Sequence, residues 1–242
     1  KPSLSSLALL PVVLAIGCGE HKAPTDQLGS DTMQNPLSAK STLVFQAPVF
    51  DKLTDSDYRP AIEAGMKKQL EEVAAIADNK EPATFENTIV ALEKSGVDFT
   101  RAVKIFYALT GSATNDSLQA IKADLAPKIA AHGDAITMND GLFQRVKAVY
   151  DNRAAMNMTP VDARLLERYY TRFVRAGALL DPKGKEEMKK LNEEESKLTT
   201  SFQDNILKAR SAAAVVVDTK EELDGPSEEA IAAAADAAKA KG

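Results

Sequence analysis

Apolar residues recur every three to four positions through most of the chain, and this period restricts the fold more than any other feature. The first series follows the cap candidates Thr54, Asp55 and Ser56, and it continues to about Asp78. Pro60 suits the first turn of such a helix. The apolar members of the series are Ile62, Met66, Leu70, Val73 and Ile76. One apolar stripe at this spacing is typical of an amphipathic helix that packs against other helices.

Cap residues and prolines divide the rest of the chain into further helices of unequal length. Starts are marked by Thr84, Asn115, Thr159 and Asp181, and Gly141 precedes another helix. The expected helices cover about residues 84–92, 99–110, 115–129, 141–150, 159–177 and 181–210, with a last one from residue 227. Only residues 214–217 have the composition of a strand. The sequence therefore predicts an all-α fold with at most one short strand.

Charge and composition exclude several classes of function. The 242 residues include 30 Lys and Arg against 35 Asp and Glu, which gives a net charge of −5. Nucleic-acid binders normally carry a basic face, and no Lys/Arg cluster supplies one, so no nucleic-acid partner is expected. One cysteine excludes a disulfide framework and multi-cysteine zinc sites. With only two histidines, His21 and His132, the composition argues against self-contained catalysis.

The beginning of the chain has the pattern of an export signal. Residues 2–19 carry no charge, and their apolar stretch, residues 7–16, is followed by Gly17 and Cys18. A bilayer span needs about 20 apolar residues, so this shorter run fits a secretory signal. Its end resembles the lipobox of bacterial lipoproteins, in which Cys18 would carry the lipid; the alternative is an ordinary signal peptide with an incidental Cys18. A lipid on Cys18 would place the protein on the periplasmic face of the bacterial envelope, anchored to the outer membrane.

Composition also sets the expected domain organisation. Residues 19–41 are rich in Ser, Thr, Asp, Gln, Gly and Pro and show little periodicity, which is typical of a flexible tether. We therefore expect a signal peptide over residues 1–18, a tether over residues 19–41 and a helical region over residues 42–242.

Three groups of residues are candidates for chemistry or binding. His132 and Asp134 lack the further ligands of a metal site, and a partly exposed histidine at a helix end explains them better. The carboxylates at 193–195 project about 100° apart on a helix, so they indicate a solvated face with a Glu193–Lys197 pair. Tyr169, Tyr170 and Arg172, beside Arg168, are candidates for peptide contact, although packing and surface charge explain them equally well. No His-Glu-x-x-His, Gly-x-Ser-x-Gly or phosphate-binding loop motif occurs.

Six segments together resemble a known family. They are QAPVFDKL (residues 46–53), YRPAIEAGM (58–66), PATFENTIVALE (82–93), LFQRVKAVY (142–150), RFVRAGA (172–178) and LNEEESKLTTSF (191–202). In order and without large gaps, from about Asn35 to the end, the chain is similar to the N-terminal part of the thimet oligopeptidase–neurolysin family of zinc metallopeptidases. Within that family it most resembles the bacterial peptidyl-dipeptidase branch.

The resemblance implies an almost wholly helical protein of two halves that enclose a channel for short peptides. Family members hold zinc on a His-Glu-x-x-His helix and a downstream Glu, and the Glu within the motif activates the zinc-bound water. That motif lies in the family's C-terminal part and does not occur in this chain. No catalytic or metal residue of the family is therefore expected here, and zinc would be bound outside this chain.

Two main hypotheses of function follow. The first is an N-terminal fragment of a zinc metallopeptidase that releases C-terminal dipeptides from oligopeptides, inactive alone, forming a wall of the substrate channel beside a missing C-terminal catalytic half. The alternative is a non-catalytic helical envelope lipoprotein that binds peptides or a protein partner; a weaker third is a purely structural helical bundle. The last helix is rich in Ala and poor in large apolar residues, which favours truncation. A fragment should also leave a contiguous apolar face exposed where the missing half would pack.

Overall fold

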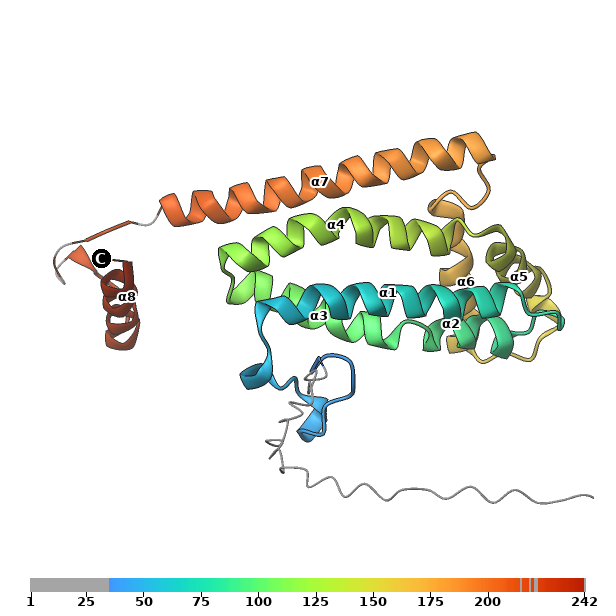
Figure 1. Cartoon of the computed structure of the whole chain (residues 1–242), viewed down its shortest axis with the longest axis horizontal. Coiled ribbons are helices and arrows are strands. Elements are labelled where there is room, and N and C mark those ends of the chain that lie inside the picture. Colours follow the sequence, from blue (N-terminus) through green and yellow to red (C-terminus); the bar gives the residue numbers. More distant parts are fainter. Residues whose placement is uncertain (1–34, 214, 218, 220–221, 242) are drawn as a thin grey trace, which may run out of the picture. The chain divides into compact units, whose positions relative to one another are not determined.

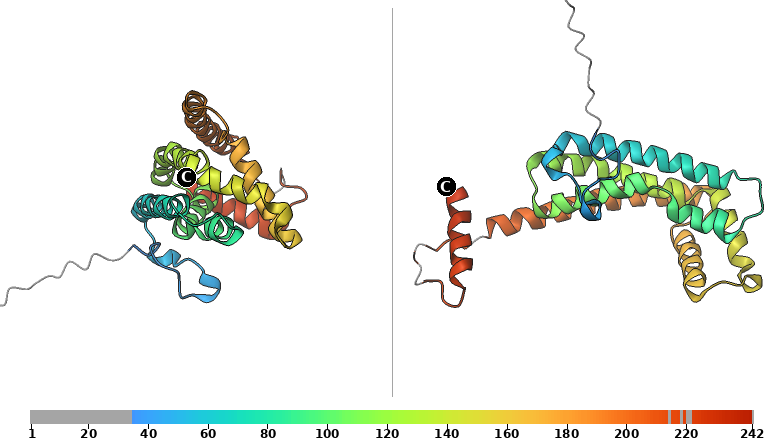
Figure 2. Two further views of the ribbon diagram at one scale, coloured as in Figure 1. Left: turned by 90° about the vertical axis from the view of Figure 1, so that its right-hand side faces the viewer. Right: turned by 90° about the horizontal axis from the view of Figure 1, so that it is seen from below.

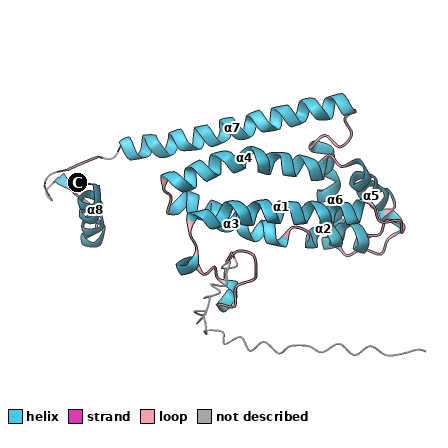
Figure 3. Ribbon diagram, viewed as in Figure 1, coloured by secondary structure: helices cyan, strands magenta, loops and turns pink. Residues whose placement is uncertain are grey.

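A computed structural model of the chain describes residues 35–213, 215–217, 219 and 222–241. The predicted signal peptide, Cys18 and most of the predicted tether lie outside the described residues. The all-α prediction is confirmed, because these residues form helices and connecting loops, with no strand among them (Figures 1 and 3). The α-helices are α1 (Asp55–Ala77), α2 (Ala91–Lys94), α3 (Val97–Ser112), α4 (Asp116–Thr137), α5 (Asp140–Asp151), α6 (Pro160–Arg175), α7 (Pro182–Ala212) and α8 (Glu228–Lys241). A π-helix, η3 (Phe85–Val90), leads into α2, and single 3-10 turns are η1 (Val44–Gln46), η2 (Phe50–Lys52) and η4 (Arg153–Ala155).

Side-chain caps explain where the helices begin. Thr84, Asn115, Thr159 and Asp181 each accept a hydrogen bond from the backbone N–H three residues further on, which satisfies a donor that the helix leaves free. These four starts confirm the prediction. The start expected after Gly141 was wrong, because Asn139 caps α5 and the helix already begins at Asp140, which places Gly141 in its first turn.

Two further details differ from the sequence prediction. Pro60 lies in the second turn of α1 rather than the first, because the helix already begins at Asp55 beyond Thr54. The predicted strand over residues 214–217 is wrong for its described part. Val215 and Val216 are exposed, and residues 215–217 have no regular structure. A lone strand has no partner to satisfy its backbone, so β propensity alone does not create one.

Two clusters of buried side chains hold α1 to α6 together, and α1 takes part in both. One cluster joins α1, α3 and α4 and contains Tyr58, Ile62, Phe106, Leu118 and Leu125. The other surrounds α5 and brings in α1, α2 with η3, and α6; its largest members are Ile89, Leu142, Phe143, Leu166 and Phe173. Burying one such side chain contributes about 1.5–3 kcal/mol, so these clusters supply the main stabilisation of the bundle.

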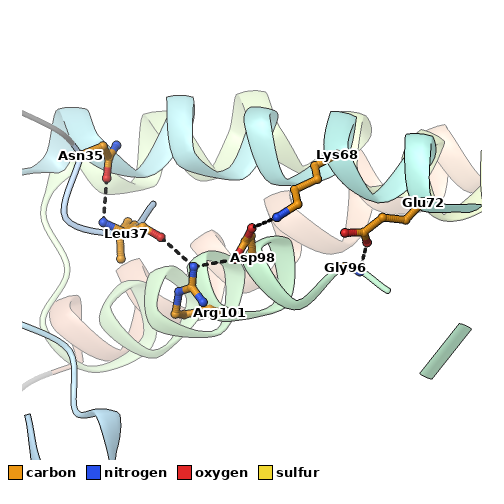
Figure 4. Close-up of polar contacts among 7 residues, drawn as sticks. All are labelled: Asn35, Leu37, Lys68, Glu72, Gly96, Asp98 and Arg101. Atoms are coloured by element: carbon orange, nitrogen blue, oxygen red, sulfur yellow. Dashed lines mark hydrogen bonds and ion pairs between the residues drawn. The ribbon is translucent and has the colours of Figure 1, made fainter. Parts of the chain in front are cut away.

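Close approach of α1 and α3 depends on a glycine. A Cβ at Gly65 would lie 2.7 Å from backbone atoms of Phe99, a distance that real Cβ atoms essentially never show. Gly96, which precedes α3, has φ of 67°, a left-handed conformation that glycine adopts without steric cost. Its N–H donates to the Glu72 carboxylate of α1 at 2.7 Å (Figure 4).

The packed region begins earlier than the boundary expected after residue 41. Leu37 is buried in the cluster of α1, α3 and α4. Its N–H donates to Asn35 at 2.9 Å, and its carbonyl accepts from Arg101 of α3 at 3.2 Å (Figure 4). Arg101 in turn pairs with Asp98 at 2.7 Å. The polar composition of residues 19–41 hid this anchor, because one buried leucine does not change the average of a segment.

Candidate functional site

An open groove of about 910 Å³ runs along the outer side of α6. It is lined by residues of α6 and one residue of α2: Glu93, Arg164, Leu165, Glu167, Arg168, Tyr169, Thr171, Arg172 and Arg175. It contains two of the three side chains that the sequence singled out for peptide contact, Tyr169 and Arg172. This groove is the candidate site.

The pattern of α6 explains why its arginines share one side. Thr159 caps the helix and Pro160 occupies its first turn, where a proline loses no hydrogen bond. Leu166 and Phe173 are buried against the bundle, which orients the helix. Arg164, Arg168 and Arg172 follow one another at intervals of four, so they lie on one face.

The hydroxyl of Tyr169 connects the groove to the bundle. It donates to the Glu93 carboxylate of α2 at 2.7 Å. Burial and this hydrogen bond raise the pKa of Tyr169 above its ordinary value of 10.0, so the phenol stays protonated at neutral pH. Tyr169 is therefore a fixed, half-buried wall of the groove.

The groove carries an excess of positive charge. Its four arginines face two glutamates, Glu93 and Glu167, an excess of two charges. Arg164 is paired with Glu167 at 2.6 Å. For Arg168 and Arg175, no ion pair or hydrogen bond occurs within the described part of the chain. Unpaired guanidinium groups bind carboxylates through two parallel N–H donors, so the groove is suited to an acidic or C-terminal carboxylate group.

Tyr170 points elsewhere. It is half-buried, its ring stacks on Tyr150 with centroids 3.9 Å apart, and it also stacks on Phe143 at 6.1 Å. The Arg153 guanidinium covers the other side of Tyr150 at 3.9 Å. This stack accounts for Tyr170 by packing, and the predicted peptide contact of Tyr170 stays a prediction.

His132 differs from its expected place. It is buried within α4 rather than partly exposed at a helix end, because its face of α4 packs on α1 and α3. Its Nε2 lies 2.7 Å from the Gln69 Oε1, and the Phe99 ring packs edge-on with its centroid 4.9 Å from that of the imidazole. Burial lowers the pKa of His132 from 6.5. The Asp134 carboxylate is also buried, accepts from Asn192 at 2.7 Å, and has a pKa raised mainly by burial.

The carboxylates at positions 193–195 do not converge on a common site. Glu193, Glu194 and Glu195 are exposed, and Glu193 pairs with Lys197 as the i, i+4 spacing predicted. Among the described residues, no three His, Cys, Asp or Glu side chains lie close enough together to hold a metal ion, so the residues seen here do not fit zinc. No described helix combines the length and apolar character that a bilayer span requires.

Arg175 and Glu93 are among the groove residues that were not singled out from the sequence. Arg175 continues the arginine series of α6, and helical spacing alone would have found it. Glu93 lies 76 positions before Tyr169, and no local pattern indicates that the two meet.

Comparison with known proteins gives the family. Dipeptidyl carboxypeptidase of Escherichia coli (strain K12) is 40% identical over 211 residues, which are 87% of this chain and 31% of the relative. The Salmonella typhimurium dipeptidyl carboxypeptidase is 38% identical over 208 residues, covering 86% of this chain and 31% of the relative. The chain belongs to this peptidase family. The organellar oligopeptidase A of Arabidopsis thaliana is similar too, at 25% identity over 198 residues, 82% of this chain and 25% of the relative.

The match covers only part of the length of these relatives. The chain spans about a third of the length of the dipeptidyl carboxypeptidases that it matches. No family model matches the chain. Membership of the peptidase family therefore rests on two long pairwise similarities.

Proposed function

We propose that this chain is part of a zinc metallopeptidase that releases C-terminal dipeptides from oligopeptides. The observation that carries this proposal is the 40% identity to a dipeptidyl carboxypeptidase over 87% of the chain. Zinc and the catalytic groups would be supplied by a C-terminal catalytic half outside this chain, and the chain alone would be inactive. Its own contribution would be one wall of the substrate channel.

Within that wall, the groove of α6 is the surface that would meet the peptide. Arg168 and Arg172 would attract acidic groups of an oligopeptide, and the fixed ring of Tyr169 would pack against its backbone or side chains. A groove that is open along its length accepts an extended chain of varied sequence, which suits a peptidase for oligopeptides.

Export and anchoring form a separate part of the proposal. The Gly17–Cys18 junction supports cleavage before Cys18 and attachment of lipid to its thiol and new amino group. Several acyl chains contribute about 0.8 kcal/mol per buried CH₂, enough for a stable hold on the periplasmic face of the outer membrane. Mass spectrometry of the mature N-terminal peptide tests this: acyl groups on Cys18 are expected, and a mature N-terminus beyond Cys18 would exclude the anchor.

The peptidase proposal is tested in a chimera in which this chain replaces the matching segment of the E. coli dipeptidyl carboxypeptidase. Dipeptide release that a chelator abolishes is expected. Arg172→Ala should raise KM for acidic oligopeptides about 1.4- to fivefold, because an exposed charge contact contributes about 0.2–1 kcal/mol. Arg210→Ala, an exposed arginine outside the groove, is the control. A folded chimera without dipeptide release would contradict the proposal.

The alternative, a non-catalytic helical envelope lipoprotein that binds peptides or a protein partner, has one observation in its favour. Four arginines and Tyr169 of the groove lie together on α6, so a charged surface for an acidic peptide would be available without a catalytic half. Fluorescence anisotropy with a labelled acidic oligopeptide separates the two proposals. Tight binding by the 242-residue chain alone, lost in Arg172→Ala, together with an inactive chimera, would favour the alternative.

A further inference from the structure

The long helix α7 lies along α4 (Figures 1 and 2), and polar side chains connect it to the bundle. The buried Lys185 pairs with Asp140 and donates to the Met138 carbonyl at 3.3 Å. Further along, Asn192 donates to Asp134 at 2.7 Å, and Asp204 pairs with Lys122 at 3.4 Å. Hollows of about 500 and 510 Å³ lie on the two flanks of this contact. Apolar burial therefore contributes little to the attachment of α7.

The large apolar residues of α7 lie on another face, in solvent. Leu191, Leu198, Phe202 and Ile206 are 60%, 62%, 65% and 45% exposed. Their spacing of seven, four and four positions places them in one stripe, which we call the α7 stripe, about 22 Å long at 1.5 Å per residue. Soluble proteins rarely leave such a contiguous row uncovered unless it is an interaction surface.

We propose that the α7 stripe is the docking surface for the catalytic remainder of the peptidase. This inference rests on the proposed function. The relatives carry more than two thirds of their length outside the matched segment, since that segment is only 31% of them. The resemblance to the N-terminal part of the family implies that this remainder follows the counterpart of α7. A partner with an apolar face of its own would bury the stripe and leave the polar contacts to α4 in place.

A second copy of this chain is a poorer occupant. A coiled coil of two α7 helices needs apolar residues at alternating three- and four-residue steps. If Leu191 and Leu198 occupy successive a positions of the heptad repeat, the core d positions fall on Glu194 and Ser201. The next a position falls on Asn205. Paired helices would bring these polar residues into the seam, so the stripe suits a different surface better than its own copy.

The test compares one pair of substitutions in two settings. Leu198→Glu with Phe202→Glu is made in the 242-residue chain and in the chimera with E. coli dipeptidyl carboxypeptidase, and Tm is measured in both. In the isolated chain, where both residues are exposed, Tm should change by about 1 °C or less. In the chimera, where the stripe would be buried, Tm should fall by about 5 °C or more. Val161→Glu, at a position on α6 that is 75% exposed, is the control and should change neither.

Several results would overturn the docking. These are an equal fall of Tm in both settings, no fall in the chimera, an insoluble chimera beside a soluble 242-residue chain, or a dimer of the 242-residue chain that the substitutions dissociate. Activity is scored separately. A chimera that shows the Tm difference but releases no dipeptides keeps the docking surface and contradicts the peptidase proposal. An active chimera without the Tm difference supports the peptidase proposal and contradicts the docking surface.

Discussion

The bundle of α1 to α6 and the long helix α7 carry apolar residues at the same helical spacing, and they place them in opposite environments. Ile62 of α1 and Phe143 of α5 are enclosed by neighbouring helices, whereas Leu198 and Phe202 of α7 face solvent. The α7 helix is attached through lysine, asparagine and aspartate instead. Helical periodicity therefore identifies an interaction face, and only the neighbours decide whether that face is covered within the same chain.

The largest difference between the two regions should appear when a phenylalanine is truncated in each. Phe143→Ala removes a ring that is 2% exposed and should cost about 3–5 kcal/mol of unfolding free energy. Phe202→Ala removes a ring that is 65% exposed and should change it by no more than about 0.5 kcal/mol. Urea unfolding of the 242-residue chain measures both. Similar losses for the two variants would remove the distinction between bundle and α7.

A glycine pair tests the tight packing inside the bundle. Gly65→Ala would force a Cβ to within 2.7 Å of the Phe99 backbone and should cost about 1–3 kcal/mol. Gly133→Ala in α4 meets nothing within 4 Å and should stabilise the chain by about 0.5–1 kcal/mol, because alanine favours a helix over glycine. Thermal unfolding of both variants supplies the comparison. A neutral Gly65→Ala would mean that α1 and α3 are less closely packed than described.

The polar attachment of α7 is tested at its buried carboxylate. Asn192→Ala leaves Asp134 without its donor and should cost about 1–2 kcal/mol. The pKa of Asp134, already raised by burial, should rise further. Hydrogen exchange of the α7 amides and NMR titration of Asp134 measure the two effects. Asn205→Ala, exposed on the same helix, is the control, and an equal response of both variants would contradict the role given to Asn192.

The smallest expected effect is a pH dependence of the bundle that comes from His132. Burial lowers the pKa of His132 below 6.5, so the unfolded chain takes up a proton more readily than the folded chain. His132 therefore adds stability above pH 6.5, and this stability is lost as pH falls through the folded pKa. In the variant His132→Gln, the free energy of unfolding should fall less between pH 7 and pH 5 than in the unsubstituted chain. Unfolding at several pH values measures this, and the same smaller fall in His21→Gln would contradict it.

Much of the fold was predictable because its signals are local. The caps at Thr159 and Asp181 act within three residues, and the apolar spacing of each helix is a short-range pattern, so starts and helical class followed from the sequence. Part of the candidate site was predictable for the same reason, since Tyr169 and Arg172 lie one turn apart on α6. The contribution of a second helix was not predictable, because Glu93 meets Tyr169 only where η3, which leads into α2, packs against α6.

By itself, the sequence determined the succession of helices, the peptidase family and the lack of the family's zinc motif, because each depends on residue types and their order along the chain. The tertiary structure decided which faces those helices cover. It buried His132 and Leu37, stacked Tyr170 on Tyr150, and left the stripe of α7 in solvent. Burial is a sum over neighbours from distant segments, and a helix carries no local record of which neighbours it will meet.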